Sequence, residues 1–429
     1  MEDSKKEKKT FKILSLDGGG MRGVISARIL KDIEETISNK YGQKLHEYFD
    51  LVAGTSTGSI LAAGIACKIT AEELINFYEK EGKNIFIKSI RDQRKWRELS
   101  KLFGRGVLYP HEFPDNSGEE GLANVLKRKL IHKDLHKCPS LSEIKDIQLL
   151  ILSYDVFYRN TTWFTNNDSR AWYIKNNIPL WKICTASASA PTFFPPYQLE
   201  HPEKGCLPHI DGGVSANNPV LAAIAHAISM EDDEGKQTKT KIYDIAVLSI
   251  GTGITTRAYT YDEVKKWGQL GWVSHLPDMF LDPDAENSEH TAYRIFKDIG
   301  SQNYLRLNFE LNKKQKQLQE KPPNKLNQLF SDLNKKINKY SLHNNPIEEK
   351  VCEDIDNPDA CEQLIKAAQK YLNSGQVFDV EEDQNILVRK AIEKFINTHP
   401  PTNQNDKNKE ADPKDSNGVT TQSKQPVTI

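Results

Sequence analysis

The chain has 429 residues, of which 38% are hydrophobic and 27% charged, enough for a large core built as two domains or as one domain with additions. Lysine and arginine (58) nearly balance aspartate and glutamate (59), and the net charge of −1 gives no basic field that would attract nucleic acid. Hydrophobic stretches such as residues 60–67 are far shorter than the roughly 20 residues of a membrane-spanning helix, and the charged N-terminus lacks the apolar region of a secretory signal, so we expect no integral membrane protein.

Between residue 11 and about residue 253, short apolar runs alternate with helical patterns, which is typical of an α/β layer fold. The runs predicted as buried strands are residues 11–16, 49–53, 148–153 and 245–250. Helical spacing of apolar residues follows the first two runs, over residues 24–37 and 59–66. Thr70 and Glu73 form a capping box that predicts the start of a further helix.

The ends of the chain differ from this main domain, which we place at residues 11–310. Residues 1–10 form a charged arm. Residues 311–399 are rich in Lys, Gln and Asn and predict a helical appendage, whose clearest apolar stripe is Ile386, Leu387, Ile392, Phe395 and Ile396. Residues 400–429 contain no aromatic residue and few apolar ones, so we expect a disordered tail.

The cysteines and acidic residues give no metal or disulfide pattern. No C-x-x-C pair occurs among the scattered cysteines, which indicates reduced thiols: Cys67, Cys138, Cys184, Cys206, Cys352 and Cys361. Asp282, Asp284 and Glu286 begin like a calcium loop. However, Asn287 stands where the sharp turn needs glycine, and Tyr293 stands where a bidentate Glu is needed. We therefore predict no metal site.

Three motifs carry candidate chemistry, and the first lies between the first predicted strand and helix: Asp17-Gly18-Gly19-Gly20-Met21-Arg22-Gly23. Successive glycines bring several N–H groups to one point at a helix N-terminus, which suits a phosphate or a developing oxyanion. Gly18, Gly20 and Gly23 also satisfy G-x-G-x-x-G, but Asp50 precedes the next strand instead of ending it, so the dinucleotide fingerprint is incomplete. A purely structural tight turn is the alternative.

The second motif is a G-x-S-x-G between a predicted strand and a predicted helix: Gly54-Thr55-Ser56-Thr57-Gly58. This is the setting of a nucleophile elbow, in which a sharp turn exposes the Ser56 hydroxyl. The helix N-terminus stabilises an alkoxide, and the N–H of Thr57 can contribute to an oxyanion hole. A serine that only caps the helix is the alternative interpretation.

The third motif is Asp211-Gly212-Gly213, which precedes a helix that we expect to begin with Asn218 as N-cap and Pro219 in its first turn. Asp211 would then lie in a loop from which its carboxylate can project into a site. Alone, the motif equally fits an aspartate that only forms a turn.

In this order the three motifs resemble those of the patatin-like phospholipases and lipid acyl hydrolases, whose hallmarks are D-G-G-G-x-R-G, G-x-S-x-G and D-G-A/G. Further similar segments are residues 153–155, 185–194, 217–219, 249–253 and 303–306. The resemblance covers about residues 11–310. It implies a three-layer α/β/α fold with a largely parallel central sheet.

The resemblance implies a serine lipid acyl hydrolase of the phospholipase A or lysophospholipase type that needs no cofactor. Its catalytic dyad would be Ser56 as nucleophile and Asp211 as base, with an acyl-enzyme intermediate. The oxyanion would be held by the amides of Gly18, Gly19, Gly20 and Thr57. The supporting motif residues would be Asp17, Arg22, Gly23, Gly54, Gly58, Gly212 and Gly213. Three roles stay open for the Arg22 side chain: it holds the glycine loop, it faces a phosphate headgroup, or it points to solvent.

Alternatives remain for the chemistry. The unperturbed pKa of aspartate, about 3.9, makes it a weak base at neutral pH, so a Ser-His-Asp triad with His209 or His226 competes with the dyad. Acyl transfer to an alcohol or lysolipid would make the protein a transacylase. A lipid- or nucleotide-binding module without catalysis could use the glycine nest alone.

A lipid substrate predicts peripheral contact with membranes and no nucleic-acid partner. Residues 88–105 predict a basic amphipathic helix, whose apolar side is Trp96, Leu99, Leu102 and Phe103. Either this helix binds an anionic lipid surface, or it packs on the protein and leaves its basic face in solvent. We expect one of two roles for an aromatic segment shortly before Asp211: it lines an acyl pocket or it belongs to the core. The segment is Phe193, Phe194 and residues 195–197. We expect a cytoplasmic location, although leaderless export would leave the same signals.

Overall fold

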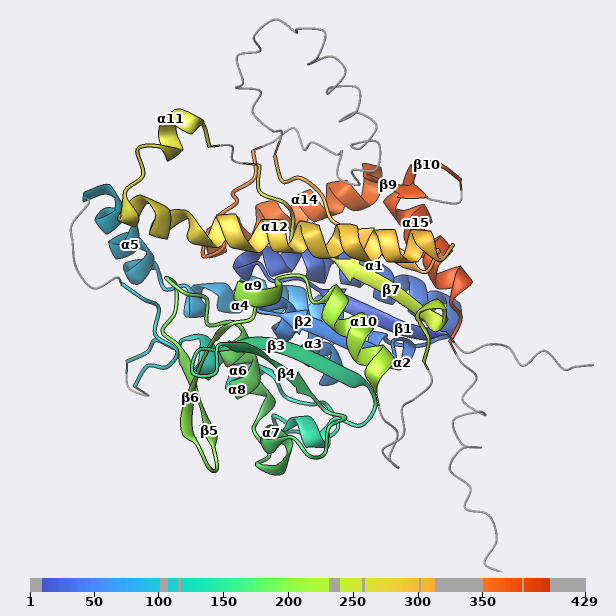
Figure 1. The fold of residues 1–429 in the computed structure, drawn as a ribbon, viewed down its shortest axis with the longest axis horizontal. Coiled ribbons are helices and arrows are strands. Elements are labelled where there is room, and N and C mark those ends of the chain that lie inside the picture. Colours follow the sequence, from blue (N-terminus) through green and yellow to red (C-terminus); the bar gives the residue numbers. More distant parts are fainter. Residues whose placement is uncertain are drawn as a thin grey trace, which may run out of the picture.

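The computed structural model describes residues 10–100, 107–114, 117–230, 240–256, 259–300, 302–312, 350–379 and 382–401 (Figure 1). The arm predicted over residues 1–10 and the tail predicted over residues 400–429 lie almost wholly outside these ranges. The same is true of the side chains on the apolar side of the predicted amphipathic helix.

A mixed sheet forms the centre of the molecule, with hydrogen-bonded neighbours in the order β5-β6-β3-β2-β1-β7-β8 and β4 paired to β3. Its strands are β1 (Phe11–Leu16), β2 (Leu51–Thr55), β3 (Gln148–Asp155), β4 (Asn160–Thr165), β5 (Tyr197–His201), β6 (Gly205–Asp211), β7 (Ile245–Ile250) and β8 (Tyr304–Leu307). β1, β2, β3, β7 and β8 are parallel, whereas β4 and β6 run antiparallel to β3. The predicted, largely parallel sheet is confirmed.

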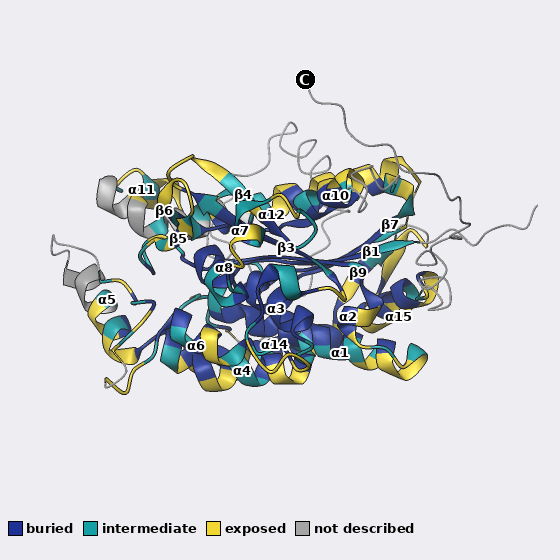
Figure 2. Ribbon diagram, turned by 90° about the horizontal axis from the view of Figure 1, so that it is seen from below, coloured by how far each residue is buried: buried dark blue, intermediate teal, exposed yellow. Residues whose placement is uncertain are grey.

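Helices cover both faces of this sheet. Figure 2 shows the sheet as a buried layer between the two layers of helices. The described helices are α1 (Gly23–Tyr41), α2 (Leu45–Tyr48), α3 (Thr57–Ala66), α4 (Ala71–Ile85), α5 (Lys88–Ser100), α6 (Leu122–Lys129), α7 (Trp172–Lys175), α8 (Leu180–Ser187), α9 (Gly213–Ala216), α10 (Val220–Ser229), α11 (Tyr261–Val264), α12 (Gln269–Asp298), α14 (Cys361–Ser374) and α15 (Val388–Thr398). Alternate residues of β1 serve two cores: Leu14 and Leu16 pack with α1 and α3, and Ile13 packs with α10 and α12. These two cores define the three-layer α/β/α fold.

Local signals set several helix ends. α4 begins with the predicted capping box, in which Thr70 and Glu73 bond to each other's backbone N–H groups. α1 ends at Gly42, which adopts the left-handed conformation common after helices. At the start of α10, the side chain of Asn218 accepts the N–H of Val220, although Pro219 occupies the cap position itself.

Two strands approach each other end to end along one edge of β3. β4 occupies one edge, so β2 and β6 share the other. β2 pairs with β3 as far as Thr55, which lies opposite Leu152. β6 takes over at the next position, where Asp211 lies opposite Ser153. Because β6 is antiparallel, the last residues of β2 and β6 point at the same place.

The C-terminal region differs from the predicted appendage, because it packs into the main core. Buried residues of α14 and α15 belong to the cluster that α1 and α3 share. The segment also forms a hairpin of β9 (Gln376–Asp379) and β10 (Gln384–Leu387), so Ile386 and Leu387 are strand residues and α15 begins at Val388. Ahead of α14, Asp359 pairs with Arg91 of α5 at 2.6 Å. The described part of this region therefore shares the main hydrophobic core.

None of the helices within the described ranges is both long and apolar enough to cross a bilayer. This agrees with the short apolar stretches of the sequence.

The packing of α14 predicts that two leucines contribute differently to the free energy of unfolding. Leu364 is fully buried in the main core, whereas the Leu387 side chain in β10 is 49% exposed. Leu364→Ala should lower the free energy of unfolding by about 2–5 kcal/mol, and Leu387→Ala by less than about 0.5 kcal/mol. Urea unfolding followed by circular dichroism measures both. A separately folding appendage would instead leave the main transition unchanged by Leu364→Ala.

Candidate active site

Ser56 occupies a sharp turn between β2 and α3. Its backbone has φ 54° and ψ −124°, a conformation that costs a non-glycine residue of order 1–3 kcal/mol. The turn is tight, because a Cβ on Gly58 would lie only 2.1 Å from the carbonyl oxygen of Leu16, and one on Gly54 would meet the carbonyl of Gly58 at 2.2 Å. The N–H of Ser56 donates to the hydroxyl of Ser187 at 2.9 Å. This is the geometry of a nucleophile elbow.

The hydroxyl of Ser56 donates to Asp211, at the end of β6, with 2.5 Å between Oγ and Oδ2. The other carboxylate oxygen of Asp211 accepts the N–H of Gly213 at 2.7 Å. The sheet register explains the contact, because β2 and β6 end at adjacent positions of β3. Gly212 is also fixed, since its N–H donates to the carbonyl of Ser187 at 3.1 Å.

Burial alters the acidity of Asp211. The side chain is nearly inaccessible to water, which raises the pKa of its carboxyl group to about 6. The hydrogen bonds from Ser56 and Gly213 favour the carboxylate and limit this rise. The carboxylate is therefore a better proton acceptor than a solvated aspartate and is still largely ionised at neutral pH.

The two histidines considered for a triad contact other groups. His209 lies on β6 two residues before Asp211, with its Nε2 3.4 Å from the hydroxyl of Thr162. His226 lies on α10, with its Nε2 3.2 Å from the hydroxyl of Thr165. Both carboxylate oxygens of Asp211 already accept hydrogen bonds from other groups, so neither ring stands between Asp211 and Ser56.

The glycine nest differs in one respect from the expected trio of amide donors. The N–H of Gly18 donates to the carbonyl of Asn217 at 3.0 Å and is therefore engaged. The N–H groups of Gly19, Gly20 and Thr57 make no hydrogen bond within the described part of the chain. These three residues line one pocket together with Ser56 and Asp211. The carbonyl of Asn217 was not foreseeable from the motif.

The C-terminal region completes this nest. Ile355 lines the pocket, and its carbonyl accepts the N–H of Met21 at 2.8 Å. Gly20 has φ 57°, and a Cβ there would come within 2.4 Å of that same carbonyl oxygen. Sequence reasoning missed Ile355, because it lies outside every motif.

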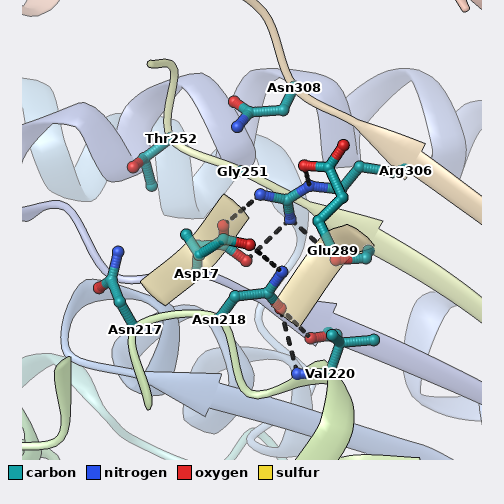
Figure 3. A network of polar contacts seen from close by, with 12 residues as sticks. Asp17, Asn217, Asn218, Val220, Gly251, Thr252, Glu289, Arg306 and Asn308 are labelled. Carbon is teal, nitrogen blue, oxygen red and sulfur yellow. Dashed lines mark hydrogen bonds and ion pairs between the residues drawn. The ribbon is translucent and has the colours of Figure 1, made fainter. Parts of the chain in front are cut away.

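A buried ion pair holds Asp17, the residue that begins the nest (Figure 3). Arg306 of β8 forks onto both carboxylate oxygens of Asp17, with Nη1 2.9 Å from Oδ1. Arg306 also donates to Ser249 of β7 at 2.8 Å and to Glu289 of α12 at 3.1 Å. Burial raises the pKa of Asp17 to about 6 against the lowering effect of Arg306. Arg306 therefore stabilises the ionised form of Asp17.

The remaining motif residues are also enclosed. Arg22 is buried, so of its three open roles the solvent-facing one is wrong. A Cβ on Gly23 would lie 2.4 Å from the hydroxyl oxygens of Thr57 and Tyr78. Gly18 is fixed from its other side as well, because Thr252 donates its hydroxyl to the Gly18 carbonyl at 2.8 Å.

The pocket beside Ser56 is apolar. Phe193 and Phe194, for which a pocket role and a core role were both open, line it. Its other apolar walls come mainly from α3 and α4: Ile60, Phe77, Tyr78, Ile85 and Phe86. A chain of methylene groups fits such a lining.

Metal-binding candidates among the described residues are weak. Asp282, Asp284 and Glu286 lie on the continuous helix α12, not in a loop, and Asp284 accepts the N–H of Asn217 at 2.6 Å. A separate group, His132, Asp134 and Asp146, lies close together. The ammonium of Lys68 already pairs with both of these carboxylates at 2.6 Å.

The buried ion pair predicts a large loss of stability when it is broken. Arg306→Gln would leave the Asp17 carboxylate buried without its countercharge and should cost about 3–5 kcal/mol of unfolding free energy. The same change at the exposed Arg170, which pairs with Asp168, should cost less than about 1 kcal/mol. Denaturant titrations of both variants, of Asp17→Asn, and of Asp17→Asn with Arg306→Gln combined measure this. Additive losses in the double variant would contradict the pairing.

Sequence comparison identifies relatives of the chain. The model of the family described as "Patatin-like phospholipase" matches residues 14–224. "Patatin-like protein 2" of Oryza sativa is 30% identical over 329 residues, covering 70% of this chain and 77% of the rice protein. "Patatin-T5" of Solanum tuberosum is 29% identical, covering 69% and 75%. Among solved structures, VipD from Legionella pneumophila aligns over 86% of this chain and 72% of its own, with 13% identity and a TM-score of 0.29. On its sequence relatives, the chain belongs to the patatin-like phospholipase family and is a lipid acyl hydrolase.

Proposed function

We propose that the protein cleaves fatty-acyl esters of phospholipids or lysophospholipids through a Ser56–Asp211 dyad and an acyl-enzyme. The observation that carries this proposal is the 2.5 Å contact between Ser56 Oγ and Asp211 Oδ2 beside an apolar pocket. The strained turn at Ser56 supports a catalytic role, because such strain is retained where the chemistry needs an exposed hydroxyl.

In the first half of the reaction, Ser56 Oγ attacks the ester carbonyl carbon while Asp211 Oδ2 takes the hydroxyl proton. Negative charge then develops on the carbonyl oxygen, and the amides of Gly19, Gly20 and Thr57 are the candidate donors that stabilise it. The tetrahedral intermediate collapses as Asp211 returns the proton to the departing alcohol.

In the second half, water attacks the acyl-enzyme and releases the fatty acid. Asp211 takes a proton from the water and returns it to Ser56 Oγ, so the enzyme regains its starting state. The apolar side chains around the pocket suit the acyl chain during both steps. This assignment needs no cofactor.

A phospholipid substrate also requires contact with a lipid surface. Two arginines of the basic segment at residues 88–105 are engaged within the protein. Arg91 pairs with Asp359, and Arg94 donates to the carbonyl of Val107 at 2.9 Å. These bonds favour a packed role for this part of α5.

The dyad predicts that Ser56→Ala and Asp211→Asn each lower kcat at least about a thousandfold, since each removes one partner of the proton transfer. Hydrolysis of a soluble short-chain ester and of phosphatidylcholine measures the loss. Labelling with a fluorophosphonate should modify Ser56 in the wild type and leave Ser56→Ala unlabelled.

Stability serves as the control for these variants. Burial penalises the Asp211 carboxylate at pH 7, where its raised pKa makes the ionised form costly, and the neutral amide of Asp211→Asn removes that cost. We therefore expect Asp211→Asn to unfold at a temperature no lower than the wild type. Substantial activity in either folded variant would exclude the dyad.

The pH dependence follows from the same group. Asp211 must be ionised to accept a proton, so kcat/KM for a soluble ester should fall as the pH drops through about 6 and level off above it. His209→Gln should show the same fall in kcat/KM at acidic pH. Loss of this fall in His209→Gln or in His226→Gln would favour a histidine-containing triad.

A further inference from the structure

The turn between β3 and β4 exposes consecutive apolar side chains. Val156, Phe157 and Tyr158 are 40%, 64% and 47% exposed, and the two rings contact each other edge to face. A run of exposed apolar residues opposes solubility and is uncommon on a soluble surface unless it has a function. Arg159 follows at once and is exposed as well. We call residues 156–159 the aromatic turn.

The backbone of the aromatic turn is fixed. Asp155 accepts the N–H groups of both Phe157 and Tyr158 on one carboxylate oxygen, at 2.8 and 3.1 Å. The N–H of Val156 donates to the carbonyl of Pro208 at 3.0 Å. The rings are therefore held outward by a hydrogen-bonded turn, and their exposure has a structural cause.

The aromatic turn lies at the same end of the central strands as Ser56 and Asp211. It follows the carboxyl end of β3, and Ser153 of β3 pairs with Asp211. The turn begins directly after Asp155, and its Val156 N–H bonds to Pro208, three residues before Asp211 on β6. The exposed rings thus lie just beyond the candidate active site.

A second exposed aromatic residue lies on the chain that leaves β7. In the sheet order, β3 stands on one side of β2 and β1, which carry Ser56 and the glycine nest, and β7 stands on the other. The chain after β7 leads to α11, where Tyr261 is 80% exposed and lies beneath the Lys265 ammonium. Figure 1 shows α11 at the same end of the molecule as α5 and the β5–β6 hairpin.

We propose that the aromatic turn, together with Tyr261 of α11, inserts into the headgroup region of a phospholipid bilayer and presents the mouth of the pocket to the lipid. The inference rests on the proposed function, which places the substrate in such a bilayer. Phenylalanine and tyrosine partition into the boundary between headgroups and acyl chains, because each combines an apolar ring with an edge or hydroxyl that tolerates water. The exposed Arg159 complements the phosphates of the headgroups, whereas the ammonium of Lys265 already pairs with Asp262 at 2.5 Å.

Vesicle binding tests this surface. The probe is a sonicated vesicle of phosphatidylcholine with a minor share of phosphatidylglycerol, and binding is measured by co-sedimentation in the Ser56→Ala background so that the lipid stays intact. Phe157→Ser combined with Tyr158→Ser should weaken binding at least about tenfold, and Tyr261→Ser severalfold. Tyr243→Ser is the matched control, because Tyr243 is 53% exposed but precedes β7, at the opposite edge of the sheet. It should bind like the parent.

Activity separates this inference from the proposed function. With Ser56 present, the Phe157→Ser/Tyr158→Ser variant should hydrolyse a soluble ester like the wild type and lose activity only on vesicles, which also shows that it folds. Unchanged vesicle binding of the double variant, or an equal loss in Tyr243→Ser, would overturn the proposed surface. Absence of all ester hydrolysis by the wild type would defeat the proposed function, whereas the binding measurements would still decide the surface.

Discussion

The edge of β3 is the constraint on which the candidate site depends. A strand offers one partner position per residue on each edge, and β4 fills one edge, so β2 and β6 must share the other. They meet between Leu152 and Ser153, and this join brings together a hydroxyl and a carboxylate that are 155 residues apart in the chain. The site is thus positioned by backbone pairing within the sheet.

Electrostatics supports the neighbouring half of the site. Asp17 follows β1 directly and precedes the glycines, so its position determines the orientation of the N–H groups in the glycine nest. The buried fork from Arg306 links the nest to β8 and, through Glu289, to α12. Charge burial is costly, and it is tolerated here because the opposite charges and their hydrogen bonds are all enclosed together. A buried ion pair of this kind is expected to add little net stability, so we infer that its main role here is to orient the loop that begins at Asp17.

Local patterns were sufficient to predict much of this arrangement. Short apolar runs predicted the principal strands, because each such signal lies within a few neighbouring residues. The alternation of these runs with helical patterns, and the family resemblance of the three motifs, predicted the fold class. The strands β4 and β6 were missed, since Asn160–Thr165 is polar and half exposed and β6 contains Pro208. The β9–β10 hairpin was missed because the apolar residues of β10 continue the helical spacing of α15. Arg306 lies 289 residues from Asp17, and no local pattern encodes a contact at that range.

The carbonyl of Ile355 on the N–H of Met21 has a consequence for how such a protein can evolve. The segment matched by the family model, residues 14–224, contains the candidate dyad of Ser56 and Asp211 and the glycines. The groups that contact the glycine loop from outside it come from β8 and from the chain ahead of α14. Recombination that transferred only the motif-bearing segment to another protein would carry the reactive groups without their support. We therefore expect a transferred segment to keep the proposed activity only when β8 and the chain ahead of α14 accompany it.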